Sequence, residues 1–250
     1  MQRCRGELCE NDPIYAGPLS SLWMQETLNK TGYSIIGRAF GGEEVATLSQ
    51  IIARSGIKQA FGVREFLLRV PELVPVLFND TVRELLRRLL PDGPRVVRSL
   101  YFDKPPNANW IVNWHQDLTV NLVHREDHPG FEKWRSVEDR MVVRPPRRYL
   151  DNMVTLRIHL DSCTAENGAL RVIPGSHLDG VTEMKNWSPA EECVTVCEVP
   201  AGGMMVMKPL LLHASRRSDV STNRRVIHLE CCSEPLPGTM QWKEAVQVPF

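Results

Sequence analysis

Two histidines and an aspartate carry the clearest chemical potential in this sequence. His115 and Asp117 lie two positions apart within Asn113–Thr119, so on a strand or at a strand end their side chains point to the same face. His213 follows the apolar run Leu210–Leu212, so the strand that carries His213 is expected to be buried, and this histidine is the candidate third ligand. Two histidines and one carboxylate form the facial triad of non-haem Fe(II) oxygenases, which leaves the opposite face open for a co-substrate and O2. The His-x-Asp spacing is weak evidence by itself, and a hydrogen-bonded core or surface histidine is the alternative.

A pair of arginines follows the distal histidine. Arg224 and Arg225 stand at the head of an apolar strand expected at Val226–Glu230. Because strand side chains alternate, one guanidinium is expected to point inward, where its planar fork matches a carboxylate. A dicarboxylate that chelates iron at one end needs such a clamp at the other, and 2-oxoglutarate is a molecule of that kind. A solvated pair of surface arginines is the alternative.

These residues must be positioned by helices in the N-terminal third and by strands after it. Capping residues, apolar stripes and stop signals predict three helices, and short runs rich in Val, Ile, Leu and Thr predict strands from about Arg95 onward. Many short strands after a helical block favour an antiparallel double sheet, such as a jelly roll, buttressed by helices. One helix is expected between a cap at Ser20-Ser21 and Gly32, a second at Glu43–Ser55, and a third after Asn79-Asp80-Thr81 that runs through Leu90 and stops at Pro91. The strands are expected at Val96–Phe102, Ile111–His115, Val154–Leu160, Ala169–Ile173, Val194–Val199, Met204–Lys208 and Arg225–Glu230.

The segment Arg125–Tyr149 interrupts the strand rhythm. It is rich in charge, with seven arginines and lysines and five acidic residues, and contains Pro145-Pro146. A solvated insertion and a lid over a site are both open readings, because long loops in compact domains are often functional. As a lid, its cations would favour an anionic substrate.

The composition argues against nucleic-acid and membrane partners but does not indicate a particular reaction. The 250 residues contain 30 Lys+Arg and 30 Asp+Glu, so no net basic charge points to nucleic acid or an anionic membrane. The apolar runs are far shorter than a membrane span, and the first residues lack an apolar signal core, so a cytoplasmic protein without nucleic-acid or membrane partners is expected. The seven cysteines are expected to be buried or inert thiols, with zinc and redox readings as alternatives. The sequence gives no indication of an oligomeric state.

Three segments in order resemble the phytanoyl-CoA dioxygenase family of Fe(II)/2-oxoglutarate oxygenases. They are Trp114-His115-Gln116-Asp117, the run Glu166–His177 (ENGALRVIPGSH), and His213 with Ser215 before Asn223-Arg224-Arg225. The likeness extends from about Gly32 to Glu230. It implies a mainly β fold, a double-stranded β-helix of the jelly-roll, cupin-like kind, with N-terminal helices packed on the larger sheet. The chain length favours a single domain over 1–250, which the resemblance makes an oxygenase domain. Its expected parts are a helical buttress at about 20–92, a β core at about 95–232 and an insertion or possible lid at 124–150.

The resemblance assigns candidate roles to further residues. Family position favours Arg224 as the 2-oxoglutarate clamp, with Arg225 as the fallback. Candidate additional contacts to that co-substrate are Ser215, Thr155 and Lys104. Asn113 and Gln116 are candidates for orienting ligands, with hydrogen bonding at the strand edge as an equal alternative. Related halogenases carry a small residue in place of the carboxylate, so the presence of Asp117 favours hydroxylation.

The implied activity is an Fe(II)- and 2-oxoglutarate-dependent dioxygenase that uses O2 and releases succinate and CO2. Its substrate is expected to be a small or medium-sized organic molecule of specialised metabolism, oxidised at an unactivated C–H bond. Two other classes stay open: a non-catalytic metal-binding jelly-roll module or sensor, and a hydrolase or isomerase with another divalent metal on the same triad.

The remaining histidines and the tryptophans are expected to be mainly structural or exposed. His177 in the PGSH turn is expected to be structural, and His124 and His128 exposed. His159 shares a strand face with Thr155 and Arg157, and His228 shares one with Arg224, so each either faces a cavity or is a bonded core histidine. Candidate walls of an apolar pocket are Trp110, Trp114 and Phe131.

Overall fold

The computed structural model describes residues 21–57, 62–104, 111–185, 187–220 and 222–250. The helices in these ranges are α1 (Ser21–Thr31), α2 (Gly42–Arg54), α3 (Phe66–Arg69), α4 (Val74–Leu77), α5 (Asp80–Leu89) and α6 (Arg147–Asp151). The strands are β1 (Tyr33–Ile36), β2 (Val63–Arg64), β3 (Arg95–Lys104), β4 (Val112–His115), β5 (Val120–Leu122), β6 (Glu132–Val137), β7 (Arg140–Arg144), β8 (Met153–His159), β9 (Leu170–Val172), β10 (Thr195–Cys197), β11 (Met204–Met207), β12 (His213–Ser215), β13 (Arg224–Cys232) and β14 (Val246–Gln247).

Two antiparallel sheets form the β core. The larger has the order β1-β11-β8-β13-β3-β14, with β2 added beside β3, and the smaller has the order β10-β9-β12-β4. From β8 to β13 the chain passes back and forth between these sheets, since β8, β11 and β13 belong to the larger and β9, β10 and β12 to the smaller. This is the winding of a jelly roll, and the predicted fold class is confirmed.

The helices form because their apolar residues recur at helical spacing. In α5, the side chains of Val82, Leu85 and Leu86 are buried on one stripe. The side chain of Asn79 caps the helix by accepting a hydrogen bond from the backbone N–H of Val82 at 3.0 Å. The helix ends just before Leu90 and Pro91, as the sequence predicts.

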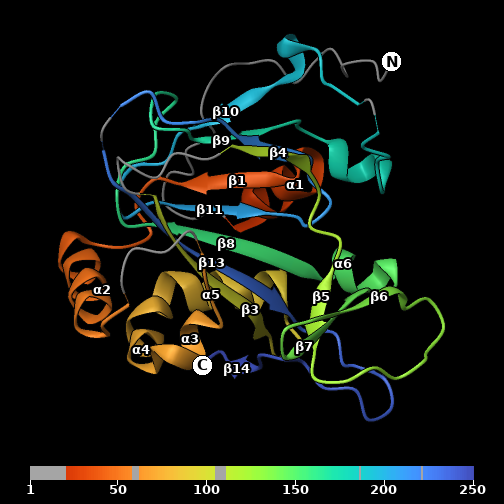
Figure 1. The fold of residues 1–250 in the computed structure, drawn as a ribbon. Helices are drawn as coiled ribbons and strands as arrows, with labels where there is room; N and C mark the ends of the chain where they lie inside the picture. Colours follow the sequence, from red (N-terminus) through yellow and green to blue (C-terminus); the bar gives the residue numbers. More distant parts are fainter. Residues whose placement is uncertain (1–20, 58–61, 105–110, 186, 221) are drawn as a thin grey trace.

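One face of the larger sheet packs against the helices. Leu156 and Ile158 of β8 and Leu229 of β13 belong to the same buried cluster as Leu48 of α2 and Leu86 of α5. Figure 1 shows α2 to α5 gathered beside β3 and β13, with β9 and β10 at the other side of the molecule. Each fully buried aliphatic side chain contributes about 1.5–3 kcal/mol, so this face supplies much of the stability. On the opposite face, residues of β1 and β11 pack on the smaller sheet, and polar residues gather on β8 and β13.

The charged segment after His124 is not an irregular insertion. Strands β6 and β7 form a hairpin there and join β5 in a third sheet of order β5-β7-β6. Its aromatic residues pack inward, with Phe131 and Tyr149 in one buried cluster with Trp242. The sequence did not predict these strands, because β6 is mostly exposed and the apolar centre of β7 is a continuous run without alternation. The reading of this segment as a lid stays a prediction.

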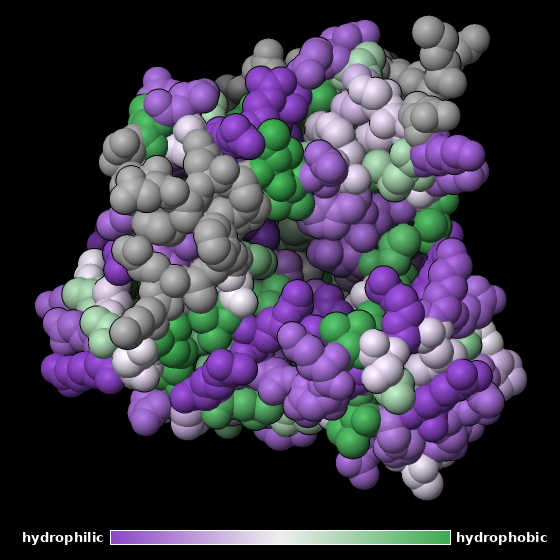
Figure 2. Space-filling view, in the orientation of Figure 1, coloured by the Kyte–Doolittle hydropathy of each residue, from purple (hydrophilic) through white to green (hydrophobic). Residues whose placement is uncertain are grey.

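Hydrophilic side chains cover most of the face seen in Figure 2, with small hydrophobic patches between them. No helix of the described ranges has the length and apolar character needed to cross a membrane. The N-terminal segment and Trp110, on which two of our expectations rested, lie outside the described residues.

Candidate metal centre

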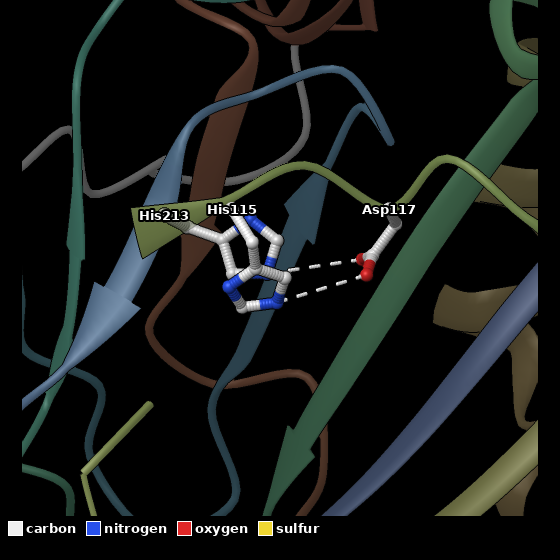
Figure 3. Close-up of side chains that lie close together, drawn as sticks. All are labelled: His115, Asp117 and His213. Atoms are coloured by element: carbon white, nitrogen blue, oxygen red, sulfur yellow. Dashed lines mark ion pairs between the residues drawn. The ribbon is translucent and has the colours of Figure 1, made fainter. Parts of the chain in front are cut away.

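The predicted triad is brought together by two neighbouring strands. His115 ends β4 and His213 begins β12, and the two residues are direct partners in the antiparallel pair. Their ring centroids lie 4.1 Å apart. Asp117 follows the end of β4, where its backbone N–H donates to the carbonyl of Pro209 at 2.9 Å. Figure 3 shows both imidazoles facing the carboxylate, with Nε2–Oδ distances of 3.9 Å from His115 and 3.8 Å from His213.

Backbone carbonyls orient both imidazoles toward a common point. Nδ1 of His115 donates to the carbonyl of Asn113 at 2.8 Å, and Nδ1 of His213 donates to that of Leu211 at 2.9 Å. Since a carbonyl can only accept, each Nδ1 carries the proton and each Nε2 presents a lone pair toward Asp117. Oδ2 of Asp117 is buried without a hydrogen-bond partner in the described structure.

The ionisation states suit a cation. Burial lowers the pKa of His213 to about 4, although the nearby Asp117 carboxylate opposes this. Burial works against ionisation of Asp117, but the surrounding groups, His213 first, hold its pKa below the usual value. The site thus offers two imidazole nitrogens and one carboxylate, with all ligand atoms within 4.8 Å of one another. This donor set fits a divalent transition metal such as iron.

Gln116, between the two ligands, points the other way. Its buried amide donates to the carbonyls of Gly180 and Leu210, both at 2.7 Å, and accepts from the backbone N–H of Thr182 at 2.8 Å. It therefore fixes the loops beside the triad and does not contact the ligands. The side chain of Asn113 is exposed, and only its carbonyl acts on His115.

The two arginines at the start of β13 have different surroundings. Arg225 forms a two-pronged ion pair with Asp161, with Nε at 2.8 Å and Nη2 at 2.7 Å from the carboxylate oxygens. Arg224 is buried, and its Nη1 donates to the carbonyl of Gly168. Among the described residues, no carboxylate lies within ion-pair distance of Arg224, and its Nε has no partner. Of these two arginines, Arg224 thus keeps a guanidinium available for a ligand carboxylate.

Gly168 explains part of the ENGALR segment. Its φ is +82°, a conformation that favours glycine, and a Cβ there would lie 2.7 Å from the carbonyl oxygen of Arg216. This backbone conformation presents the carbonyl that receives Arg224.

The other predicted co-substrate contacts lie on inward faces or at a strand end. Ser215 is buried two residues after His213 on β12. Thr155 of β8 is fully buried, and its hydroxyl has no partner in the described structure. Lys104 ends β3 opposite Arg224, but its side chain lies outside the described part of the chain.

A second set of polar residues was not assigned a role from the sequence. His228 and Glu230 of β13 could form a metal-binding group with Asp117. Glu230 is already paired with Arg98, at 2.7 Å between Oε1 and Nη1. Nδ1 of His228 accepts from Nη1 of Arg157 at 3.1 Å. The available signal was polar residues recurring at every second position of otherwise apolar strands.

The expectations for the other histidines and for Trp114 have different outcomes. His177 has a structural contact through Nε2 to the carbonyl of Asn29 at 3.1 Å. His159 is buried with neither ring nitrogen bonded to a described residue, so it is not a bonded core histidine. Trp114 faces away from the triad and packs on Trp187 and Arg171, so it does not line a pocket there.

A family model for phytanoyl-CoA dioxygenase (PhyH) matches residues 28–226, a range that contains the triad and Arg224. The chain belongs to this family. A curated relative, the phytanoyl-CoA dioxygenase domain-containing protein 1 homolog of Caenorhabditis briggsae, is 27% identical over 112 residues, 45% of this chain and 31% of that protein. The corresponding homolog of Caenorhabditis elegans is 27% identical over 109 residues, 44% and 30% of the two chains. The match thus spans about a third of the length of these relatives.

Several solved structures match the fold over most of the chain. The non-heme alpha ketoglutarate dependent carbocyclase SnoK from nogalamycin biosynthesis matches with a TM-score of 0.62 and 17% identity, covering 94% of this chain and 100% of that one. EvdO2 of Micromonospora carbonacea var. aurantiaca, complexed with 2-oxoglutarate, matches with a TM-score of 0.65 and 18% identity, and the match covers 89% of this chain and 94% of that one. HygX of Streptomyces hygroscopicus, with iron bound, matches with a TM-score of 0.63 and 15% identity, and the match covers 86% of this chain and 87% of that one. The chain therefore has the family and the fold of iron/2-oxoglutarate oxygenases.

Proposed function

We propose that this protein is an Fe(II)- and 2-oxoglutarate-dependent dioxygenase that hydroxylates an unactivated C–H bond of a small or medium-sized organic substrate of specialised metabolism. The convergence of two carbonyl-oriented imidazoles and one partnerless carboxylate oxygen carries the proposal. His115, Asp117 and His213 would hold the metal. Within the family, iron with 2-oxoglutarate and O2 supplies the oxidising chemistry, with succinate and CO2 as co-products.

The protein's own residues bind and orient in this scheme. Arg224 receives the distal carboxylate of 2-oxoglutarate, because it is buried, charged and without a carboxylate partner among the described residues. Ser215 and Thr155 contribute hydroxyls to the same ligand, and Lys104 is a further candidate. The bound iron and 2-oxoglutarate of HygX and EvdO2 support this ligand pair.

Two features separate this proposal from its alternatives. Asp117 supplies a carboxylate at the position that halogenases leave open for chloride, which favours hydroxylation. Arg224 on the inward face of β13 favours an oxygenase over a hydrolase or isomerase on the same triad, since those reactions need no dicarboxylate clamp. A non-catalytic metal-binding module would bind iron tightly without turning over 2-oxoglutarate.

Removal of a triad ligand is the direct test. His115→Ala and Asp117→Ala should each abolish Fe(II) binding, measured by metal analysis after anaerobic gel filtration, and should abolish 2-oxoglutarate-dependent succinate formation. His124→Ala changes a half-exposed histidine outside the triad and serves as the matched control. Full iron binding and succinate formation in either triad variant would contradict the assignment. Tight iron binding without any turnover by the unmodified protein would favour the non-catalytic module.

A further inference from the structure

Arg157 places a second guanidinium on the inward face of the larger sheet. It lies in the middle of β8, directly opposite His228 of β13 and Met205 of β11. Its Nη1 donates to Nδ1 of His228 at 3.1 Å. A ring nitrogen of His228 lies in turn within 4.8 Å of carboxylate oxygens of Asp117 and Glu230. The guanidinium is thus one imidazole ring away from the proposed metal ligands.

The charge of Arg157 is not neutralised by its described neighbours. No carboxylate of the described residues lies within ion-pair distance, and its only hydrogen bond goes to the neutral acceptor nitrogen of His228. Its Nε is buried without a partner. The carbon at the centre of the guanidinium lies 5.9 Å from the ring centroid of Phe102, which supports a cation without supplying an opposite charge.

The state of Arg157 at neutral pH is nonetheless charged. Burial, together with repulsion from Arg224, lowers its pKa to about 10. Placing a charge in a protein interior without a partner destabilises the folded protein. Arg225 shows how the same chain satisfies a guanidinium, because its Nε and Nη2 meet both oxygens of Asp161. In Arg157 those two nitrogens have no hydrogen-bond partner among the described residues.

No group of the proposed complex supplies a negative charge that balances the Arg157 guanidinium. Glu230 and Arg98 cancel as an ion pair. A ferrous ion and a 2-oxoglutarate dianion cancel each other. Asp117 then offsets Arg224, and one positive charge is left over. On the basis of the proposed function, neither the metal nor the co-substrate supplies its counter-charge.

We propose that Arg157 binds a carboxylate of the substrate, so that the substrate class is monoanionic carboxylic acids. The planar Nε–Nη2 edge matches a carboxylate in two hydrogen bonds, which a neutral amide of the same shape cannot reproduce. Arg157 is then a specificity-determining residue: it fixes the acid group beside the triad and thereby sets which carbon lies near the metal.

The test compares acids with their own amides. The anaerobic protein is loaded with Fe(II) and saturating 2-oxoglutarate, and the visible charge-transfer band of that complex is followed during titration. The probes are aliphatic, aromatic and amino carboxylic acids, each with its primary amide. Acids should perturb the band at concentrations at least tenfold lower than the matched amides. Arg157→Gln should abolish this preference and change the dissociation constant of 2-oxoglutarate by less than threefold, whereas Arg157→Lys should keep part of the preference.

The control and the adverse outcomes separate the two proposals. Arg171→Gln alters an arginine of β9 that packs on Trp114 and pairs with Glu191, and it should change neither measurement. Equal response to acids and amides, or no response to any acid, overturns the role of Arg157 and leaves the oxygenase assignment intact. An Arg157→Gln variant that loses 2-oxoglutarate affinity assigns Arg157 to the co-substrate and also overturns it. Absence of the band in unmodified protein overturns the oxygenase assignment and this inference together.

Discussion

Alternate residues of β8 and β13 face opposite sides of one sheet and meet different surroundings. The outward residues Val154, Leu156 and Ile158 are apolar and fully buried against the helices. The inward residues Thr155, Arg157 and His159 are polar, and each has a buried nitrogen or oxygen without a partner in the described structure. The same strands therefore carry a face that stabilises the fold and a face that costs stability.

The difference supports our proposal that the inward face binds ligands. An unsatisfied buried polar group costs about 1–3 kcal/mol, and such groups occur together here on neighbouring strands. On β13 the inward His228 and Arg224 repeat the pattern, since His228 Nε2 and Arg224 Nε also have no described hydrogen-bond partner. A chain retains such a face where ligands complete its hydrogen bonds, and the outward face offsets the cost.

The largest expected effect is the loss of stability caused by a substitution on the outward face. Leu156→Ala should lower the free energy of unfolding by about 3 kcal/mol, because it leaves a cavity in a fully packed core. Urea denaturation followed by circular dichroism measures this. Leu68→Ala is the control, since that leucine is 51% exposed and its loss should cost less than about 0.5 kcal/mol. Equal effects of the two changes would contradict the assignment of stability to the outward face.

The next effect concerns ligand binding by the inward face. Arg224→Gln should weaken 2-oxoglutarate binding about a hundredfold, or about 2.7 kcal/mol, because it removes a charge-assisted clamp. Anaerobic titration of the Fe(II) protein with 2-oxoglutarate measures the dissociation constant.

Arg225→Gln is the matched control for that change. Its guanidinium is committed to Asp161, so it should alter the dissociation constant by less than about threefold. If Arg225→Gln causes the larger loss, the clamp is assigned to the wrong arginine.

The smallest expected effect is a gain in stability, whereas substitutions of buried residues usually lower the free energy of unfolding. Thr155→Val keeps the side-chain shape and removes a buried hydroxyl that has no described partner, so the free energy of unfolding should rise by about 1 kcal/mol in the absence of ligands. Val154→Thr, one residue away on the outward face, should lower it by about 1–2 kcal/mol. Thermal and urea unfolding of both variants provide the measurement. A loss of stability in Thr155→Val would mean that the hydroxyl is satisfied in the folded protein.

Sequence patterns predicted the parts of the molecule that follow periodicity or carry a dense motif. The stripe of α5 and the alternation of β8 and β13 each follow from residue types at fixed spacing. The geometry brings His115, Asp117 and His213 together as the motif order implied, although their roles as ligands stay a prediction.

Other elements left no such pattern. β1 is four residues long and buried throughout, so it shows no alternation, and β12 has only three residues. β6 is mostly exposed and charged, as a solvated loop would be, and β7 has an apolar centre without alternation between two charged ends. Arg157 could be placed on an inward face from sequence, but its lack of a counter-charge depends on the positions of Asp161, Glu230 and Arg98, which only tertiary structure fixes.

The hydrogen bonds of Gln116 have a consequence for the order in which the molecule assembles. This side chain joins the end of β4 to the carbonyl of Leu210, 94 residues later in the chain, and to the loop at Gly180. Contacts between such distant segments close late in folding. A chain emerging from the ribosome thus presents His115 and Asp117 long before His213 arrives beside them. Under the proposed function, only chains that have finished folding have all three ligands in place. The metal therefore binds to folded chains and, by mass action, stabilises only those.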